Sequence, residues 1–323
     1  MPLHPEILDG TPTEGARGLA LGMLAEARGR ASLLAGPADA EALHDFRVSI
    51  RRLRSTLRAW REPLGKPVRD KDLRRLRRVA RATSAARDAE VMVAWVAGIA
   101  GSLPPAHRAT ADWLAARLDS GTQRADLSRS LERFGAAADS LTRRFGRETP
   151  AGSPGALAGT SAGTFAAALA GRIREQASSV QACLSRVKTE DDAPLAHRAR
   201  IEGKRLRYLI EPLREAIGAR ADPAVKALKR LQDLLGDLND AQLAATATRE
   251  ARQELGAEPA RAGQGSRLVG LRPGLRALER LADERAHQLF SRILAEVLPT
   301  HGAALLEPAL GVAAALEARA HSS

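Results

Sequence analysis

The sequence of 323 residues contains a single cysteine, Cys183, and few aromatic side chains. One cysteine excludes a disulfide scaffold and a metal site built from several cysteines. Aromatic residues make up 3% of the chain, which argues against sugar-binding clefts and base-stacking platforms. The first residues show no basic region followed by an apolar run, and no stretch approaches about 18 consecutive apolar residues. We therefore expect a cytoplasmic protein that does not associate with membranes.

Hydrophobic residues, in contrast, make up 44% of the chain and charged residues 27%, a composition typical of globular proteins. The chain has 50 Lys and Arg against 38 Asp and Glu, a net charge of +12, which favours an anionic partner. Arginine and alanine are both abundant, and a GC-rich coding bias produces the same pairing. The positions of the charges are therefore more informative than their sum.

The positive excess is confined to two short segments. Residues 43–87 contain fifteen Lys and Arg against four Asp and Glu, and residues 195–230 contain ten against four. The rest of the chain has 25 Lys and Arg against 30 Asp and Glu. A compositional bias would spread the charge evenly, so this segregation favours a binding site.

The two basic segments align with each other. The pattern H-x2-R-x3-[RK]-R-L-R begins at His44 and again at His197, an offset of 153 residues. Residues 73–79 match residues 225–231, and Arg87-Asp88-Ala89 matches Asn239-Asp240-Ala241, both at an offset of 152. An ordered series of matches indicates an internal repeat whose period is too long for a solenoid, so we infer one duplication.

Most of the chain has the composition of helices, since Ala, Leu, Arg and Glu dominate and β-branched runs are missing. We predict an all-α protein of two pseudo-symmetric antiparallel helical bundles from an internal duplication, with a basic groove between them. Residues 1–150 form the first bundle and residues 151–323 the second, together one domain. The Gly-, Pro- and Ser-rich residues 146–163 are the predicted joint, and residues 256–274 a long loop.

Capping residues and early prolines mark the expected helix starts. In the first half the starts are expected near Thr13, Asp39, Arg69, Asp88, Pro105 and Thr122. In the second half they are expected near Ser161, Asp192, Asp222, Asp240, Pro273 and Thr300.

At about 100° per residue, the bases of the first motif fall within an arc of roughly 80° on one helix face. This face consists of His44, Arg47, Arg51, Arg54 and Arg58, and the predicted core face consists of Phe46, Ile50, Leu53, Leu57 and Trp60. The second motif repeats the basic face with His197, Arg200, Lys204 and Arg207, and the predicted core face with Ala199, Leu206, Ile210, Leu213 and Ile217. Further basic faces follow at Arg74, Arg77, Arg78 and Arg81, opposite Leu76 and Val79, and at Lys226, Lys229 and Arg230, opposite Leu228 and Leu231.

A charge run is most often an ordinary solvated face, but such faces usually mix acids with bases. Like charges one turn apart destabilise a helix, and here they are stacked with few acids between them. Arginine binds phosphate oxygens with two parallel hydrogen bonds, so a base at every turn suits a ligand with repeated phosphates. The two histidines either contact such a ligand or have a structural role, and the sequence leaves both open.

The residues 43–60 and 195–213, together with Arg87-Asp88 and residues 234–241, resemble the CHAD domain (conserved histidine α-helical domain). The resemblance covers most of the chain. It implies two pseudo-symmetric helical bundles around a basic groove or pore, binding of inorganic polyphosphate, and association with polyphosphate granules, where protein partners are expected. At Thr83-Ser84 the first half departs from the leucine-glycine step that the family usually has before its Arg-Asp pair.

Carried over by position, the resemblance implies ligand contacts in both halves. In the first half these are His44, Arg47, Arg51, Arg52, Arg54, Arg74, Arg77 and Arg78. In the second half they are His197, Arg200, Lys204, Arg205, Arg207, Lys226, Lys229 and Arg230. The helical phase adds Arg58 and Arg81 to the expected polyphosphate-binding set.

Binding of polyphosphate without catalysis, and without a cofactor or metal, is the leading hypothesis. A nucleic-acid-binding protein would use the same phosphate electrostatics, but aromatics are scarce and no recognised nucleic-acid-binding motif is present. An enzyme acting on phosphoanhydrides would need carboxylates to hold Mg²⁺. Asp88 and Asp240 are the candidates for such ligands, although helix capping or pairing with an arginine is expected for them instead.

Overall fold

The computed structural model describes residues 4–35, 40–120, 127–147, 163–257 and 270–322, and within these ranges every regular element is a helix. The predicted all-α fold is confirmed. The helices of the first half are α1 (Pro12–Ser32), α2 (Ala40–Ala59), α3 (Arg61–Leu64), α4 (Asp70–Ala100), α5 (Pro105–Ser120) and α6 (Leu127–Arg147). Those of the second half are α7 (Phe165–Leu184), α8 (Ala193–Ile210), α9 (Arg214–Ile217), α10 (Ala221–Ala257), α12 (Arg272–Glu296) and α13 (Ala303–Ser322).

Short 3-10 helices flank or join several of these elements. They are η1 (Pro5–Leu8), η2 (Leu33–Ala35), η3 (Glu190–Asp192), η4 (Glu211–Leu213), η5 (Gly218–Arg220) and η6 (Leu298–Thr300). In the part of the chain that the structure describes, no helix is both long enough and apolar enough to cross a membrane.

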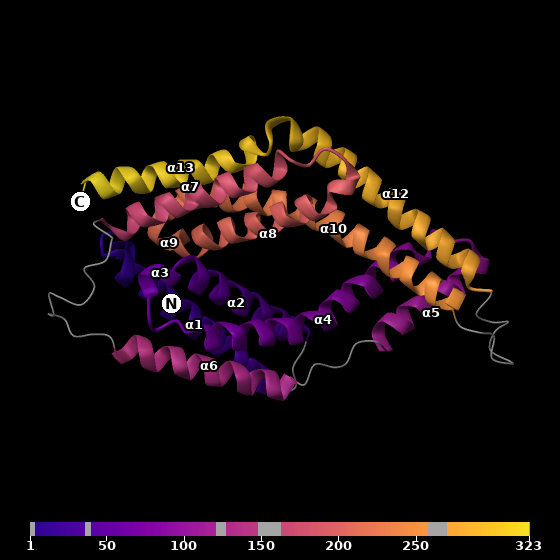
Figure 1. Cartoon of the computed structure of the whole chain (residues 1–323), viewed down its shortest axis with the longest axis horizontal. Coiled ribbons are helices and arrows are strands. Elements are labelled where there is room, and N and C mark those ends of the chain that lie inside the picture. Colours follow the sequence, from indigo (N-terminus) through magenta and orange to yellow (C-terminus); the bar gives the residue numbers. More distant parts are fainter. Residues whose placement is uncertain (1–3, 36–39, 121–126, 148–162, 258–269, 323) are drawn as a thin grey trace.

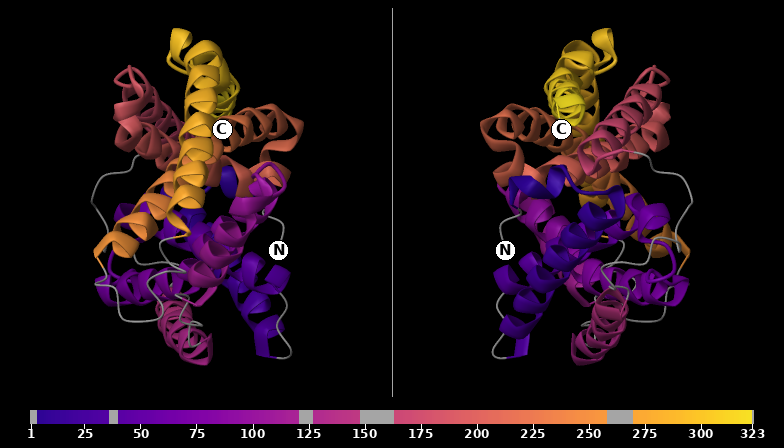
Figure 2. Two further views of the ribbon diagram at one scale, coloured as in Figure 1. Left: turned by 90° about the vertical axis from the view of Figure 1, so that its right-hand side faces the viewer. Right: turned by 90° about the vertical axis from the view of Figure 1, so that its left-hand side faces the viewer.

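The helices of the second half lie over those of the first, with α2 and α8 facing each other between them (Figure 1). In each half the long central helix, α4 or α10, packs against the motif helix, α2 or α8. At one end of the molecule α4 packs against α5, α10 packs against α12, and α5 contacts α12 (Figures 1 and 2). Elsewhere α1 contacts α7, so the two halves are joined in both places.

The main core is a continuous cluster of buried apolar side chains from both halves. The predicted core residues of α2 and Trp60, which follows it, are fully buried, as are Ala199, Leu206 and Ile210 of α8. Helix α8 ends at Ile210, so of the two remaining predicted core residues Leu213 lies in η4 and is buried, whereas Ile217 lies in α9 and is only partly buried. At the junction of the halves, Trp60 packs on Phe165 with ring centroids 4.7 Å apart. Gly15 of α1 permits this junction, because a Cβ there would lie 2.1 Å from the Phe165 ring. A smaller cluster around Val96, Leu114 and Leu278 forms the core at the far end.

Local features recur at matched positions of the two halves. Gly65 and Gly218, 153 residues apart, both follow a single-turn helix and both have positive φ, 56° and 72°, a conformation that glycine adopts without steric cost. Arg61 pairs with Asp70 at 2.6 Å, and the matched Arg214 donates to Asp222 at 2.8 Å. These features support the duplication, which stays an inference.

Two expected helix starts are wrong. Helices α4 and α10 continue without interruption past Asp88 and Asp240, over 31 and 37 residues. An aspartate caps a helix only where the chain leaves helical geometry, and neither site is preceded by a strong breaker. A single glycine such as Gly236 costs about 1 kcal/mol in a helix and does not end it. The hydroxyl of Thr83 bonds to the carbonyl of Val79 within the same helix.

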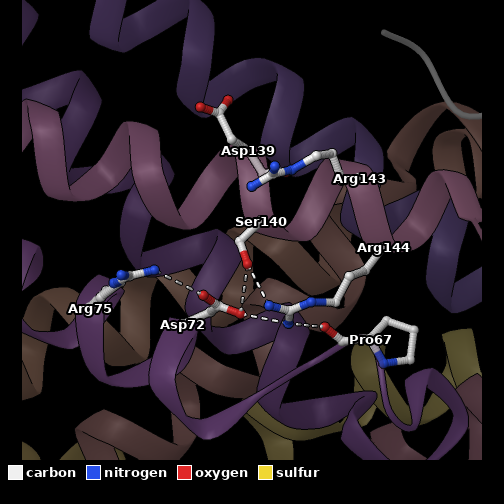
Figure 3. A network of polar contacts seen from close by, with 7 residues as sticks. All are labelled: Pro67, Asp72, Arg75, Asp139, Ser140, Arg143 and Arg144. Atoms are coloured by element: carbon white, nitrogen blue, oxygen red, sulfur yellow. Dashed lines mark hydrogen bonds and ion pairs between the residues drawn. The ribbon is translucent and has the colours of Figure 1, made fainter.

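The first half contains a buried ion-pair network without a counterpart at the matched position of the second (Figure 3). Asp72 of α4 is 1% exposed, accepts a 2.8 Å hydrogen bond from Arg144 of α6, and lies 3.6 Å from Arg75. Arg144 also donates to the carbonyl of Pro67 at 3.0 Å. The residue matched to Asp72 is Ala224, which is fully buried. The first half therefore holds α4 against α6 partly by charge, where the second half uses apolar packing.

The predicted joint at residues 146–163 lies largely outside the described residues, as does most of the predicted loop at 256–274. The ends of these segments that the structure describes are partly helical. Residues 256 and 257 belong to α10, and residues 272–274 belong to α12. The division at residue 150 stays a prediction.

Candidate functional site

A pocket of about 530 Å³ lies between α2 and α8, where two of the predicted basic faces meet. We call it the α2/α8 pocket. Its charged and titratable lining consists of Arg51, Arg54 and Arg58 from α2 and His197, Arg200, Lys204 and Arg205 from α8. The rest of its lining consists of Ser55, Ala59, Gln176, Ile201, Tyr208 and Leu209. Every formal charge in this lining is therefore positive.

The period of the helix places these side chains. Arg51, Arg54 and Arg58 are spaced by three and four residues, so they project from one face of α2. A neighbouring face of the helix, about 100° away, is anchored by fully buried residues such as Leu53 and Leu57. Burial of that apolar face fixes the rotation of α2, and the arginines must then face α8.

Most of the cations in the pocket lack an acidic partner. Among the described residues, no carboxylate oxygen lies within 4.0 Å of the charged groups of five lining cations, Arg51, Arg54, Arg58, Arg200 and Lys204. The Nε atoms of Arg51 and Arg200 are also buried without a hydrogen-bond partner. The Nε atoms of Arg52 and Arg207, which lie outside the lining, are in the same state, so the donors left for acceptor oxygens in the pocket are the terminal guanidinium nitrogens and the Lys204 ammonium.

The concentration of charge changes the acidity of the lining groups. Burial lowers the pKa of Lys204 to about 8, with further lowering by the charges of Arg200 and Arg51 and a small opposing effect of Asp240. Burial also lowers the pKa of Arg54, and the charges of Arg58, Arg77 and Arg81 add to it. In both groups burial is the largest cause of the lowered pKa, and the neighbouring positive charges add to it.

The two motif histidines have different surroundings. Nδ1 of His197 lies 2.7 Å from Oδ1 of Asn239, and the amide nitrogen of Asn239 donates to Asp240 at 3.2 Å. The contact with Asp240 orients the amide so that its oxygen faces the histidine, and Nδ1 then donates the proton. Nε2 of His197 is then an acceptor in the neutral ring, and it donates to an anion in the pocket it lines only when it also carries a proton. His44 is exposed and lies outside the lining.

The structure does not bring every predicted residue into the lining. Arg52 pairs with Glu26 at 3.4 Å and with Glu211 of the other half at 3.0 Å, and Arg207 lies 3.7 Å from Glu211. Arg47 is 6% exposed and does not line the pocket. Arg205 lines it but already pairs with Glu202 at 2.7 Å. One residue along a helix is a rotation of about 100°, so Arg52 leaves the face that Arg51 occupies.

The predicted residues of α4 and α10 lie outside the pocket lining. Those exposed on these two helices are Arg74, Arg77, Arg78, Arg81, Lys226, Lys229 and Arg230. Arg230 pairs with Glu296 of α12 at 2.9 Å. Of the four predicted basic faces, those of α2 and α8 line the pocket. Ligand contacts from the faces of α4 and α10 stay predictions.

Sequence reasoning missed the neutral part of the lining. Tyr208 follows the second basic motif directly and is 7% exposed, with the guanidinium of Arg207 5.4 Å from its ring centroid. Gln176 comes from α7, which contains no motif, and its amide donates to Glu202 at 2.7 Å. The position of Tyr208 beside the motif is a usable signal, whereas nothing in the sequence around Gln176 marks it.

Comparison with known proteins is consistent with the fold. The family described as "CHAD domain" matches residues 20–249. The crystal structure of the CHAD domain from the plant Ricinus communis is similar with a TM-score of 0.62 at 20% identity, over 90% of this chain and 94% of that one. PptA from Streptomyces chartreusis is similar with a TM-score of 0.50 at 20% identity, over 86% of this chain and 99% of that one. Comparison with curated proteins gave no match.

Proposed function

The chain belongs to the CHAD domain family, and from this premise we propose that it binds inorganic polyphosphate in the α2/α8 pocket. The single observation that supports this most is the group of five lining cations without a carboxylate nearby among the described residues. Phosphate oxygens are the matching acceptors, since guanidinium groups bind them with paired, charge-assisted hydrogen bonds. Each phosphate of the polymer would relieve the repulsion between neighbouring cations.

The lining favours polyphosphate over nucleic acid. Proteins that bind single strands offer exposed aromatic faces on which bases stack. The aromatic residue of the pocket lining, Tyr208, is 7% exposed and offers no such face. A pocket of about 530 Å³ suits a narrow unbranched polymer better than a duplex. Nucleic acid is therefore the competitor to test.

We propose that the site binds without catalysis. Phosphoryl transfer usually needs carboxylates that hold Mg²⁺, and the residues lining the pocket include none. Asp240, the sequence candidate for a metal ligand, instead acts on Lys204 and accepts a hydrogen bond from Asn239. Within the described residues, no group of three or more His, Cys, Asp or Glu side chains could hold a metal ion. Binding would bring the protein to polyphosphate granules, where other proteins could meet it.

Calorimetric titration with polyphosphate at physiological salt tests the proposal. We expect saturable binding that weakens as salt increases, because bound phosphates release counterions. Duplex and single-stranded nucleic acid at equal phosphate concentration should fail to displace the polymer. Displacement by either would contradict selectivity, and release of phosphate by the pure protein with Mg²⁺ would contradict binding without catalysis.

A further inference from the structure

The cations that extend beyond the pocket are distributed unequally between the two halves. In the first half, Arg54 and Arg58 line the pocket, and α4, which packs against α2, exposes Arg77 and Arg81 one turn apart. Because α2 packs against α4, these four side chains belong to neighbouring helices, and the charges of Arg58, Arg77 and Arg81 all contribute to lowering the pKa of Arg54. Among the described residues, none of the four has a carboxylate oxygen within 4.0 Å. We call three of these residues the α4 arm: Arg58 of α2, which also lines the pocket, and Arg77 and Arg81 of α4.

The second half has acids where the α4 arm has arginines. By the offsets of the repeat, Glu211 matches Arg58, and Asp233 matches Arg81. Glu211 binds Arg52 at 3.0 Å and lies 3.7 Å from Arg207. At two positions where the first half has an arginine, the second half therefore has an acid.

The remaining bases of the second half are fewer or already paired. Lys229 stands where the arm has Arg77, but it has an acid, Asp233, one turn further along α10. Arg230 of the same helix is held by Glu296 of α12 at 2.9 Å. Two halves with the same fold thus present unequal positive charge at the two sides of one pocket.

We propose that a polyphosphate too long for the α2/α8 pocket continues along the α4 arm, and that the matched face of α10 does not receive it. The inference rests on the proposed function and adds the path of the ligand. A polymer on the arm would meet three guanidinium groups without an acidic partner among the described residues, whereas the matched face of α10 has Asp233 in place of Arg81 and an Arg230 that is already paired with Glu296. Juxtaposed like charges disfavour the second path.

The path predicts a dependence on chain length. Tripolyphosphate should be bound by the pocket alone, and a long polymer should gain the contacts of the arm. In the variant Arg77→Glu/Arg81→Glu, we expect affinity for long-chain polyphosphate to fall by at least about tenfold, with less than about threefold change for tripolyphosphate. For the neutral variant Arg77→Ala/Arg81→Ala, the slope of log affinity against log salt should decrease by about one per lost contact for the long polymer.

Two variants complete the experiment, which uses calorimetric titration of the full chain with both ligands and circular dichroism to verify folding. Arg276→Glu/Arg280→Glu on α12 makes the same charge change at the same helical spacing, at exposed positions outside the site, and should leave both affinities unchanged. Lys226→Glu/Lys229→Glu on α10 should weaken long-chain binding by less than about threefold, which supports the one-sided path.

Equal losses from the α4 and α10 variants would overturn the one-sided path while leaving polyphosphate binding in place. No loss from the α4 variant would also overturn it, since the arm would then not contact the ligand. If the unaltered protein bound neither tripolyphosphate nor the long polymer, the proposed function itself would fail. The two failures are therefore separate results.

Discussion

The lining of the α2/α8 pocket and parts of the outer surface both contain arginines, but they differ in whether these arginines have acidic partners. On the outside, arginines pair with acids from other elements: Arg174 donates to Glu317 at 2.7 and 2.6 Å, and Arg319 donates to Asp9 at 2.6 Å. In the pocket, five cations have no such partner among the described residues. Exposed arginines such as Arg276 and Arg280 also have no acid within 4.0 Å among the described residues, so what distinguishes the pocket is that such cations cluster there between two helices.

The largest effect that separates these regions is expected from charge reversal in the pocket. In Arg51→Glu/Lys204→Glu, two charge-assisted contacts become repulsions, and we expect polyphosphate affinity to fall by more than about a hundredfold with helicity retained. Calorimetric titration measures the affinity and circular dichroism the helicity. The matched outer variant Arg174→Glu/Arg319→Glu should bind nearly as the unaltered chain does, and a similar loss in both variants would remove the contrast.

Within α2, the contrast lies between neighbouring residues. Leu53→Ala removes a fully buried side chain and should lower the free energy of unfolding by about 2–5 kcal/mol, as should Leu206→Ala in α8. Arg54→Gln, one residue further along, should instead weaken binding and leave the fold intact. Urea denaturation followed by circular dichroism checks the first effect and titration the second. Similar behaviour of Leu53 and Arg54 variants would show that the assigned face of α2 is wrong.

Removing an unpaired cation should stabilise the protein without its ligand. The pKa of Lys204 is lowered to about 8 first by burial and then by the charges of Arg200 and Arg51, so the charged lysine destabilises the isolated fold by both effects. We expect Lys204→Met to raise the free energy of unfolding by about 1 kcal/mol at low salt and pH 7 while weakening polyphosphate binding. Urea denaturation at low and high salt measures this, and a stability gain independent of salt would argue against repulsion as its cause.

The smallest expected effect is a dependence on pH. The pKa of Lys204 is about 8 in the fold against a reference of 10.5, so between these values the unfolded chain binds the proton and the fold does not. This group therefore makes stability rise as pH increases from about 8 to 10.5, and its destabilising effect is fully present below pH 8.

Affinity should change in the opposite direction, because Lys204 loses its charge in the free pocket as pH passes about 8. Titrations between pH 7 and pH 9 should show binding of the unaltered protein weakening by a fewfold, about the effect of one lost charge. The variant Lys204→Arg keeps its charge and should not weaken over this range. A parallel decline in Lys204→Arg would assign the pH dependence to another group.

Helical periodicity alone was enough to predict which face of each motif helix enters the core. Phe46, Ile50 and Leu53 follow from the spacing of apolar residues, and their burial then fixes where Arg51 and Arg54 point. The basic pocket between the halves was predictable to this extent. The continuity of α4 and α10 past Asp88 and Asp240 could not be predicted in this way. Capping preferences are local, and packing along the whole helix outweighs them.

The partners of individual cations could not be predicted from the sequence. Arg51 and Arg52 are adjacent and chemically identical, yet one lines the pocket and the other joins the halves through Glu211. That difference depends on acids brought in by distant segments, which no local pattern contains. The contribution of Gln176 from α7 was unpredictable for the same reason.

The packing of Trp60 on Phe165 and the ion pair between Arg52 and Glu211 hold the two halves at a fixed separation. If polyphosphate binds here, we expect it to meet a pocket that is already formed and to bind without a preceding conformational step. Encounter should then be accelerated by long-range attraction, with an on-rate that falls steeply with ionic strength. Residence time, in contrast, should depend on how many successive phosphates a bound polymer can keep engaged at once.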